Sequence, residues 1–270
     1  MKSFPRVFLM SALLLLAAVN LTAQSNYQVI SVTDGGTISG TVKWSGPEPR
    51  GLDVAVNKDP EICDPDSHKT INLERMVMGP DGGVANTVVF LKNISSGKAM
   101  SLPEIRRSLD QKHCRYEPHI LLVPQSAMLA MQSSDHVLHT VHMEGAATFN
   151  VAFPFTDRVI TRQMDTPGIV NLQCNGGHVW MNAELMVAPH PYYAVTDRDG
   201  KFELTDVPPG TYQVVAWHEG WRVLGRKSTL DVFSQQTIQR ALFSEPTILE
   251  QSVTLRPRET VQLKFALSQK

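Results

Sequence analysis

Short apolar stretches separated by turn residues run through most of this chain, and few of them repeat at the helical period. Residues 38–44 alternate between apolar and polar side chains, and residues 84–91 form a denser apolar run after the turn at 80–83. Further apolar runs follow at 120–123, 146–151 and 168–172. Alternation and short buried runs of this kind predict β-strands. We therefore predict an all-β chain built from sandwiches or barrels.

A second block of alternating runs begins near residue 192. Its turns at 197–200 and 207–210 are rich in Asp, Gly and Pro, and the strands that they separate predict a hairpin-built domain. Pro189 and Pro191 restrict the backbone and break any strand ladder. We place the domain boundary there, with one domain over residues 61–189 and another over 190–270.

The amino terminus has the pattern of a secretory signal peptide. Lys2 and Arg6 precede an apolar run over residues 7–19, which leads into Leu21, Thr22 and Ala23. That run has about 13 residues, which is short of the roughly 20 that cross a bilayer. We expect cleavage near Ala23, a mature chain without a membrane span, and a periplasmic or secreted location.

Charge and cysteine content narrow the function classes. The chain has 25 Lys and Arg against 26 Asp and Glu, so it lacks the basic surplus that nucleic-acid binding requires. Its three cysteines cannot all pair within one exported chain. We favour a Cys63–Cys114 disulfide, because Cys174 alone lies among residues that could share a metal with it. The sequence leaves the connectivity open.

Cys174, His178 and Met181 form a short loop motif with metal-binding side chains. A thiolate, two imidazoles and a weak axial thioether are the ligands that suit mononuclear copper, because the sulfur stabilises Cu(I) and the imidazoles accept Cu(II). A second histidine has to come from a neighbouring strand.

Three upstream histidines are candidates for that position: His136, His139 and His142. In a strand, His136 and His142 face one side and His139 faces the other. We choose His139, because its aliphatic neighbours favour the neutral imidazole that binds metal. A zinc site made from all three histidines would require a helix.

Residues 134–142, followed by Cys174, His178 and Met181, resemble the copper site of plastocyanin-like cupredoxins. The resemblance spans residues 85–187 and implies a Greek-key β-sandwich with one type 1 copper bound by His139, Cys174, His178 and Met181. Two features depart from the family pattern. Three residues separate the cysteine from the loop histidine where small members have two, and Thr140 stands where an asparagine is common. A hydroxyl replaces only part of the hydrogen bonding that such an asparagine provides.

The second block, over residues 193–212, resembles a carboxypeptidase regulatory-like module, which implies a smaller β-sandwich of transthyretin (prealbumin) type. Residues 35–44 resemble the opening strand of such a module. The N-terminal region, residues 24–60, is therefore a candidate to pair with the C-terminal domain, which would make the cupredoxin an insertion.

These features lead to one main functional hypothesis and two alternatives. The main hypothesis is an exported copper protein that transfers electrons to or from a redox partner protein, while the C-terminal module holds it on a cell-surface protein or glycan. We expect it not to be an enzyme, because no Ser/His/Asp arrangement with a recognisable context occurs. The alternatives are a carbohydrate- or protein-binding module without functional copper, and copper delivery or storage.

Overall fold

The computed structural model describes residues 27–101, 107–230, 235 and 237–269. Strands make up nearly all of its regular structure, and the helical pieces in those ranges are α1 (Pro60–Cys63) and a 3-10 turn, η1 (Pro80–Gly82). The prediction of an all-β fold is confirmed. The predicted signal peptide, residues 1–23, lies outside the described residues. Within the described part of the chain, no helix is long and apolar enough to span a bilayer.

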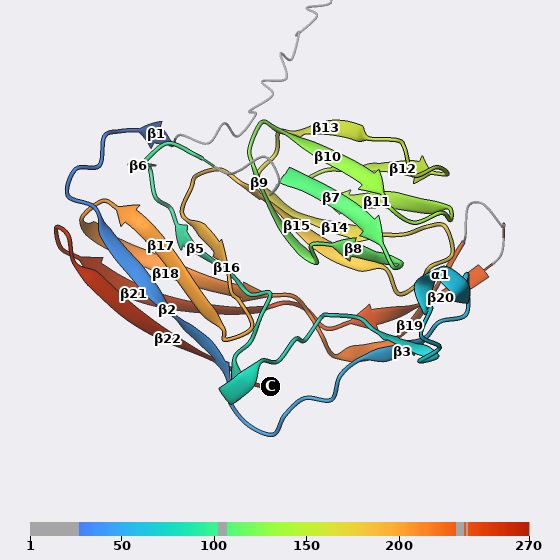
Figure 1. Cartoon of the computed structure of the whole chain (residues 1–270). Helices are drawn as coiled ribbons and strands as arrows, with labels where there is room; N and C mark the ends of the chain where they lie inside the picture. The colour runs from blue at the N-terminus through green and yellow to red at the C-terminus, as the bar shows by residue number, and fades with distance from the viewer. Residues whose placement is uncertain (1–26, 102–106, 231–234, 236, 270) are drawn as a thin grey trace, which may run out of the picture.

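The strands form two β-sandwiches that lie side by side (Figure 1). In the first sandwich, one sheet has the order β13 (Ile160–Met164), β10 (Ala127–Ser133), β7 (Ser108–Lys112) and β8 (Arg115–Glu117). The other sheet has the order β12 (Phe149–Phe153), β11 (His139–Gly145), β14 (Gly168–Gln173), β15 (Asn182–Ala188) and β9 (Ile120–Pro124). Most neighbouring strands are antiparallel, whereas β7 and β9 join their sheets in parallel with β10 and β15.

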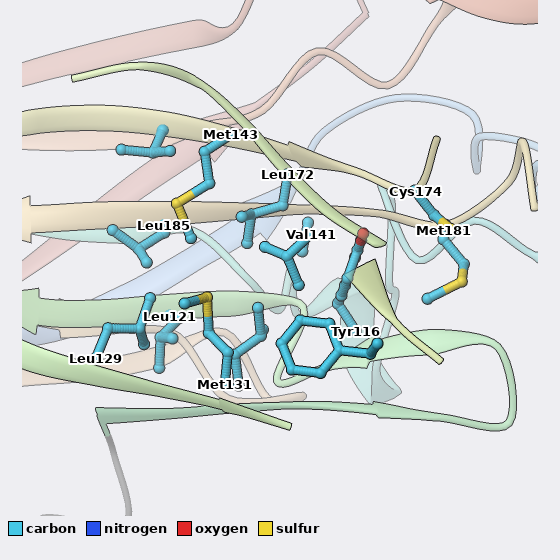
Figure 2. Close-up of a cluster of buried hydrophobic side chains, with 14 of the residues drawn as sticks. Tyr116, Leu121, Leu129, Met131, Val141, Met143, Leu172, Cys174, Met181 and Leu185 are labelled. Atoms are coloured by element: carbon cyan, nitrogen blue, oxygen red, sulfur yellow. The ribbon is translucent and has the colours of Figure 1, made fainter. Parts of the chain in front are cut away.

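The two-residue period of these strands decides which side chains form the first core. On β14, Val170 and Leu172 are buried between the sheets, while Asn171 points to the opposite face and is exposed. The core also contains Tyr116 from β8 and the residues shown in Figure 2, where Cys174 and Met181 lie at one end of the drawn cluster. The strands of the first sandwich therefore carry the candidate ligands to one end of its core.

The second sandwich combines strands from both ends of the chain. One sheet has the order β16 (Tyr193–Val195), β5 (Val88–Lys92), β18 (Gly210–His218) and β21 (Thr247–Leu255). The other has the order β17 (Lys201–Val207), β2 (Gly36–Trp44) and β22 (Thr260–Leu267). The N-terminal strand β2 thus pairs with β17 and β22, and the first sandwich is inserted between β5 and β16.

This pairing differs from the predicted domain limits at one point. The sequence analysis assigned residues 61–189 to the first domain, whereas β5, within that range, lies between β16 and β18 of the second sandwich. The reason is a long-range strand pairing, which the local pattern of apolar residues does not encode.

Three short hairpins or strand pairs lie outside the sandwiches: β1 (Gln28–Val29) with β6 (Ser96–Gly97), β3 (Asp53–Ala55) with β4 (Thr70–Asn72), and β19 (Val223–Leu230) with β20 (Thr237–Phe243). A separate apolar cluster joins the sandwiches, with Val88 and Trp217 from the second and Ile120 and Met186 from the first. The sandwiches therefore share a packed interface.

Candidate metal centre

Three of the predicted ligands converge at one end of the first sandwich. His139 is the first residue of β11, Cys174 directly follows β14, and His178 lies in the loop that leads to β15. The Cys174 Sγ atom lies 4.0 Å from Nδ1 of His139 and 3.9 Å from Nδ1 of His178. All three side chains are fully buried.

These separations fit a metal ion bound between the three atoms. Metal–sulfur and metal–nitrogen bonds of about 2.3 and 2.05 Å at trigonal angles would place the ligand atoms about 3.8 Å apart. The observed sulfur–nitrogen distances are close to that value, and the three ligand atoms lie within 4.8 Å of one another. The residues present therefore fit a metal with one thiolate and two imidazole ligands.

Each imidazole is held by a carboxylate on its other nitrogen. Nε2 of His139 lies 2.9 Å from Oδ2 of Asp135, and Nε2 of His178 lies 2.9 Å from Oδ2 of Asp59. In a neutral imidazole, the form that binds a metal, a carboxylate acceptor keeps the proton on Nε2 and leaves the lone pair on Nδ1, which is the nitrogen that faces Cys174. The two histidines are thereby oriented for binding through Nδ1.

Hydrogen bonds to the sulfur favour the thiolate form of Cys174. Backbone N–H groups of Thr140 and Gly176 each donate to Sγ at 3.4 Å, and the Thr140 hydroxyl lies 3.8 Å from it. Burial raises the pKa of the Cys174 thiol, but the hydrogen bonds and charges of His139 and His178 outweigh burial and lower it well below its usual value. The sulfur is therefore available as an anionic ligand.

The same neighbours change the proton affinity of His139 and Asp135. Burial lowers the pKa of His139, but its contacts with Asp135 and Cys174 outweigh burial and raise it to about 9. Burial raises the pKa of Asp135, and its hydrogen bonds with His139 and with the N–H groups of Cys114 and His113 lower it overall. Without a metal, the imidazolium of His139 thus lies between two anions and stabilises both.

Thr140 links the ligand strand to the ligand loop. Its hydroxyl accepts a hydrogen bond of 2.6 Å from the N–H of Asn175, and its carbonyl accepts one of 2.5 Å from the Tyr116 hydroxyl. This bridge between the residue after His139 and the residue after Cys174 joins the two ligand segments where cupredoxins commonly use an asparagine. The substitution that the sequence analysis singled out therefore leaves a cross-link in place.

The loop is also held by Arg240 on β20, a strand of the hairpin that lies outside both sandwiches. The Nη2 atom of Arg240 donates to the carbonyl of Cys174 and, at 3.3 Å, to Oδ1 of Asn175. Its Nη1 atom donates to the carbonyl of Val179 at 3.4 Å. Charged donors to three points of one loop restrict its motion. The ligand loop is therefore fixed by residues outside the first sandwich.

The other predicted residues have different surroundings. Met181 is buried in the same core as Cys174, and its N–H donates to the carbonyl of His178 at 3.0 Å. Its role as a fourth ligand stays a prediction. His136 is exposed, and His142 pairs with Glu144 at 2.9 Å away from the three converging side chains.

A disulfide joins Cys63 and Cys114, and Cys174 is a free buried cysteine. Sequence reasoning missed Asp59 and Asp135, which hold the imidazoles. Asp135 could have been noticed four residues before His139, whereas Asp59 is 119 residues from His178 and carries no local signal.

Comparisons with known proteins give weak likenesses. A family model described as polysaccharide lyase family 4, domain II, matches residues 168–240, a little over a quarter of the chain. Comparison with curated proteins gives no match.

Three solved structures are similar to part of the chain. A purple cupredoxin from Nitrosopumilus maritimus is 15% identical, with a TM-score of 0.27, over 30% of this chain and 98% of that one. A copper-containing nitrite reductase from Thermus scotoductus is 14% identical, with a TM-score of 0.29, over 36% of this chain and 25% of that one. A heme-copper terminal oxidase chain is 18% identical, with a TM-score of 0.25, over 36% of this chain and 78% of that one.

The comparisons correct one prediction and leave another open. One of the similar structures is a cupredoxin, and the matched family model does not identify the second sandwich as a module of transthyretin type. The prediction that the chain is not an enzyme is contradicted, because the matched family model belongs to a polysaccharide lyase family.

Proposed function

We propose that His139, Cys174 and His178 would hold one type 1 copper ion in the first sandwich, with Met181 as a fourth and weaker ligand, and that the protein transfers electrons. The observation that carries this proposal is the donor set itself: one buried sulfur and two Nδ1 atoms directed at a common point. Copper bound there would supply a one-electron Cu(II)/Cu(I) couple.

The surrounding residues supply what outer-sphere electron transfer requires. Two backbone N–H groups stabilise the thiolate of Cys174, and the carboxylates of Asp59 and Asp135 fix the imidazole rings. Because these groups are held by other parts of the fold, they keep the same positions in both oxidation states and limit reorganisation. The buried location excludes bulk water from the sulfur.

Contact with a redox partner protein is expected near Asp59. The rings of His139 and His178 are fully buried, whereas the Asp59 side chain bonded to His178 is 31% exposed. This pair therefore connects the buried site with the surface. An exported location, based on the predicted signal peptide, would bring the protein together with a periplasmic or extracellular partner.

Copper loading with absorption spectroscopy tests the proposal. Mature protein loaded with Cu(II) should show one equivalent of copper and an intense visible band from thiolate charge transfer. The Cys174→Ser variant should lose the band, while His142→Gln, which changes a histidine outside the site, should keep it. Copper-saturated protein without such a band would contradict the proposal. Rapid exchange of Cu(I) with a chelator, together with slow electron transfer, would instead favour copper delivery.

A second candidate function, binding of an oligosaccharide, is favoured by a cavity of about 720 Å³. Its floor is formed by polar side chains on the outward faces of β14 and β15, namely Asn171, Gln173, Asn182 and Glu184. The β19–β20 hairpin covers it and contributes Arg226, Lys227 and the aromatic ring of Phe243. Amides, cations and an aromatic ring suit an acidic sugar chain, and the matched family model for a polysaccharide lyase domain, over residues 168–240, includes the floor residues, Arg226 and Lys227 but not Phe243.

Calorimetry with trigalacturonate and a neutral trisaccharide tests this candidate. The acidic probe should bind more tightly, and Lys227→Gln should weaken its binding, whereas Lys201→Gln on the distant strand β17 should not. Equal absence of binding for both sugars would exclude an oligosaccharide site in this cavity.

A further inference from the structure

The two aspartates that hold the imidazoles each accept a backbone hydrogen bond from a cysteine of the same disulfide. Asp59 lies directly before α1, and its carbonyl accepts a hydrogen bond of 3.0 Å from the N–H of Cys63. Cys63 is bonded to Cys114, whose own N–H donates to Oδ2 of Asp135 at 2.8 Å. The disulfide therefore joins the segment that carries Asp59 to the turn that binds Asp135.

The disulfide also lies directly beside the candidate metal centre. Its two sulfur atoms and a ring nitrogen of His178 are within 4.8 Å of one another. Cys63 and Cys114 are 5% and 0% exposed. The bond is thus enclosed with the ligands and does not join two surface loops.

The Asp59 segment has weak local structure of its own. The helix α1 has four residues, and Asp59 before it adopts a left-handed backbone conformation with φ of 45°. A single helical turn does not persist without tertiary anchoring. Nearby apolar side chains of the segment pack on the first core, and the disulfide adds a covalent link within four residues of Asp59.

The turn at Cys114 presents both of its N–H groups to Asp135. His113 and Cys114 have φ of 49° and 53°, as a two-residue type I′ hairpin between β7 and β8 requires. Their N–H groups each donate to the Asp135 carboxylate at 2.8 Å. The carboxylate in turn holds Nε2 of His139.

We propose that Asp59 and Asp135 are positioning residues for the two metal-binding imidazoles, and that the Cys63–Cys114 disulfide acts on the metal centre by keeping Asp59 on His178. The positioning role rests on the proposed copper function where it is tested by Cu(II) affinity. Oxidation of the two thiols would then be a condition for a fully formed site, so the protein would acquire its metal tightly only after export to an oxidising compartment.

The proposal is tested by combining variants at both positions. Asp59→Ala should weaken Cu(II) binding about 10- to 100-fold, which is the usual cost of removing a carboxylate that holds a ligating histidine. Asp59→Asn keeps an acceptor for Nε2 and should restore most of the affinity. The double variant Cys63→Ala/Cys114→Ala should weaken binding to a similar extent. Glu144→Gln is the matched control, because Glu144 holds His142 at the same 2.9 Å outside the site and should leave affinity unchanged.

Non-additivity distinguishes this role from a general loss of structure. If the disulfide acts through Asp59, adding Asp59→Ala to the disulfide-free variant should cause little further loss. Full additivity, or a disulfide-free variant that binds copper like the wild type, would overturn the proposal. Circular dichroism of each variant identifies those that remain folded, and the Asp59 variants retain the disulfide.

Nitrogen NMR of labelled histidines in the metal-free protein separates this proposal from the copper function. His178 should carry its proton on Nε2 in the wild type and in Glu144→Gln, and this preference should weaken in Asp59→Ala and in the disulfide-free variant. If the wild type binds no copper but this pattern holds, the copper function fails and the positioning role stands. If copper binds and the His178 tautomer is the same in every variant, the positioning role fails.

Discussion

His190 provides a quantitative test of how burial controls stability in this fold. It lies between β15 and β16, is 6% exposed, and is surrounded by tyrosine rings, with centroids 5.8, 6.1 and 4.9 Å away for Tyr27, Tyr192 and Tyr193. Burial lowers the pKa of His190 to about 4, against a smaller opposing effect of backbone hydrogen bonds at Leu91 and at His190 itself. Its Nδ1 accepts a hydrogen bond from the N–H of Tyr192, which requires the unprotonated nitrogen.

The sign of the pH effect follows from the two states. In the folded protein His190 stays neutral until the pH falls to about 4, whereas in the unfolded chain it takes up a proton at about pH 6.5. The unfolded state therefore binds more protons between these values, and stability is lost as the pH falls through this window. At about 1.4 kcal/mol for each pKa unit, the 2.5-unit difference corresponds to a loss of about 3 kcal/mol.

Urea unfolding of wild type and His190→Phe over this pH window measures the effect. Phenylalanine fills the space but has no titrating group, so its packing cost is independent of pH. The free energy of unfolding of the wild type, relative to the variant, should fall by about 3 kcal/mol between about pH 7 and pH 4. A difference between the two proteins that stays constant with pH would refute the assignment of a neutral buried imidazole.

Three further predictions concern the first sandwich and its surroundings. Burial and the charge of a neighbouring glutamate raise the pKa of Glu184 from 4.5 to about 8, so unfolding releases its proton, and the free energy of unfolding should fall as the pH rises from about 4.5 to 8. Urea titrations of Glu184→Gln should not show this decline. The same dependence of unfolding free energy on pH in the variant and the wild type would contradict the prediction. Thr140→Val leaves the N–H of Asn175 without its acceptor, which should cost about 1–3 kcal/mol in chemical denaturation, and a neutral effect would show that the bridge is not needed. Removing the Cys63–Cys114 bond, whose ends have a sequence separation of 51, should cost about 4 kcal/mol by loop entropy in thermal and urea unfolding. A loss below about 1 kcal/mol would contradict an entropic role.

The strands and the ligand loop are the parts of this molecule that sequence reasoning reaches. Alternation predicts β-strands because one face of each strand is buried, as for Val170 and Leu172 against Asn171 on β14. Cys174 and His178 are close in sequence, so their spacing could be evaluated directly. His139 required a further argument from strand parity and apolar neighbours, and it lies 4.0 Å from the sulfur.

The groups that hold the ligands depend on contacts that leave no local pattern. Asp59 reaches His178 from a segment outside residues 85–187, and it directly precedes a one-turn helix that ends at the disulfide-bonded Cys63. Arg240 reaches the carbonyl of Cys174 from a hairpin of the C-terminal region. A single aspartate or arginine in a polar stretch is typical of a solvated surface, so composition favours the wrong interpretation for both.

Long-range strand pairing explains why these distant groups meet. Because β2 and β5 pair with C-terminal strands, the chain enters and leaves the first sandwich on the side of the second one. The segment between β2 and β5 is therefore carried past the ligand loop, where Asp59 contacts His178, and the β19–β20 hairpin places Arg240 on the carbonyl of Cys174. It follows that the candidate metal centre depends on segments outside the first sandwich, since the excised sandwich would retain His139, Cys174 and His178 but lose a hydrogen-bonding contact on the loop and another on one imidazole.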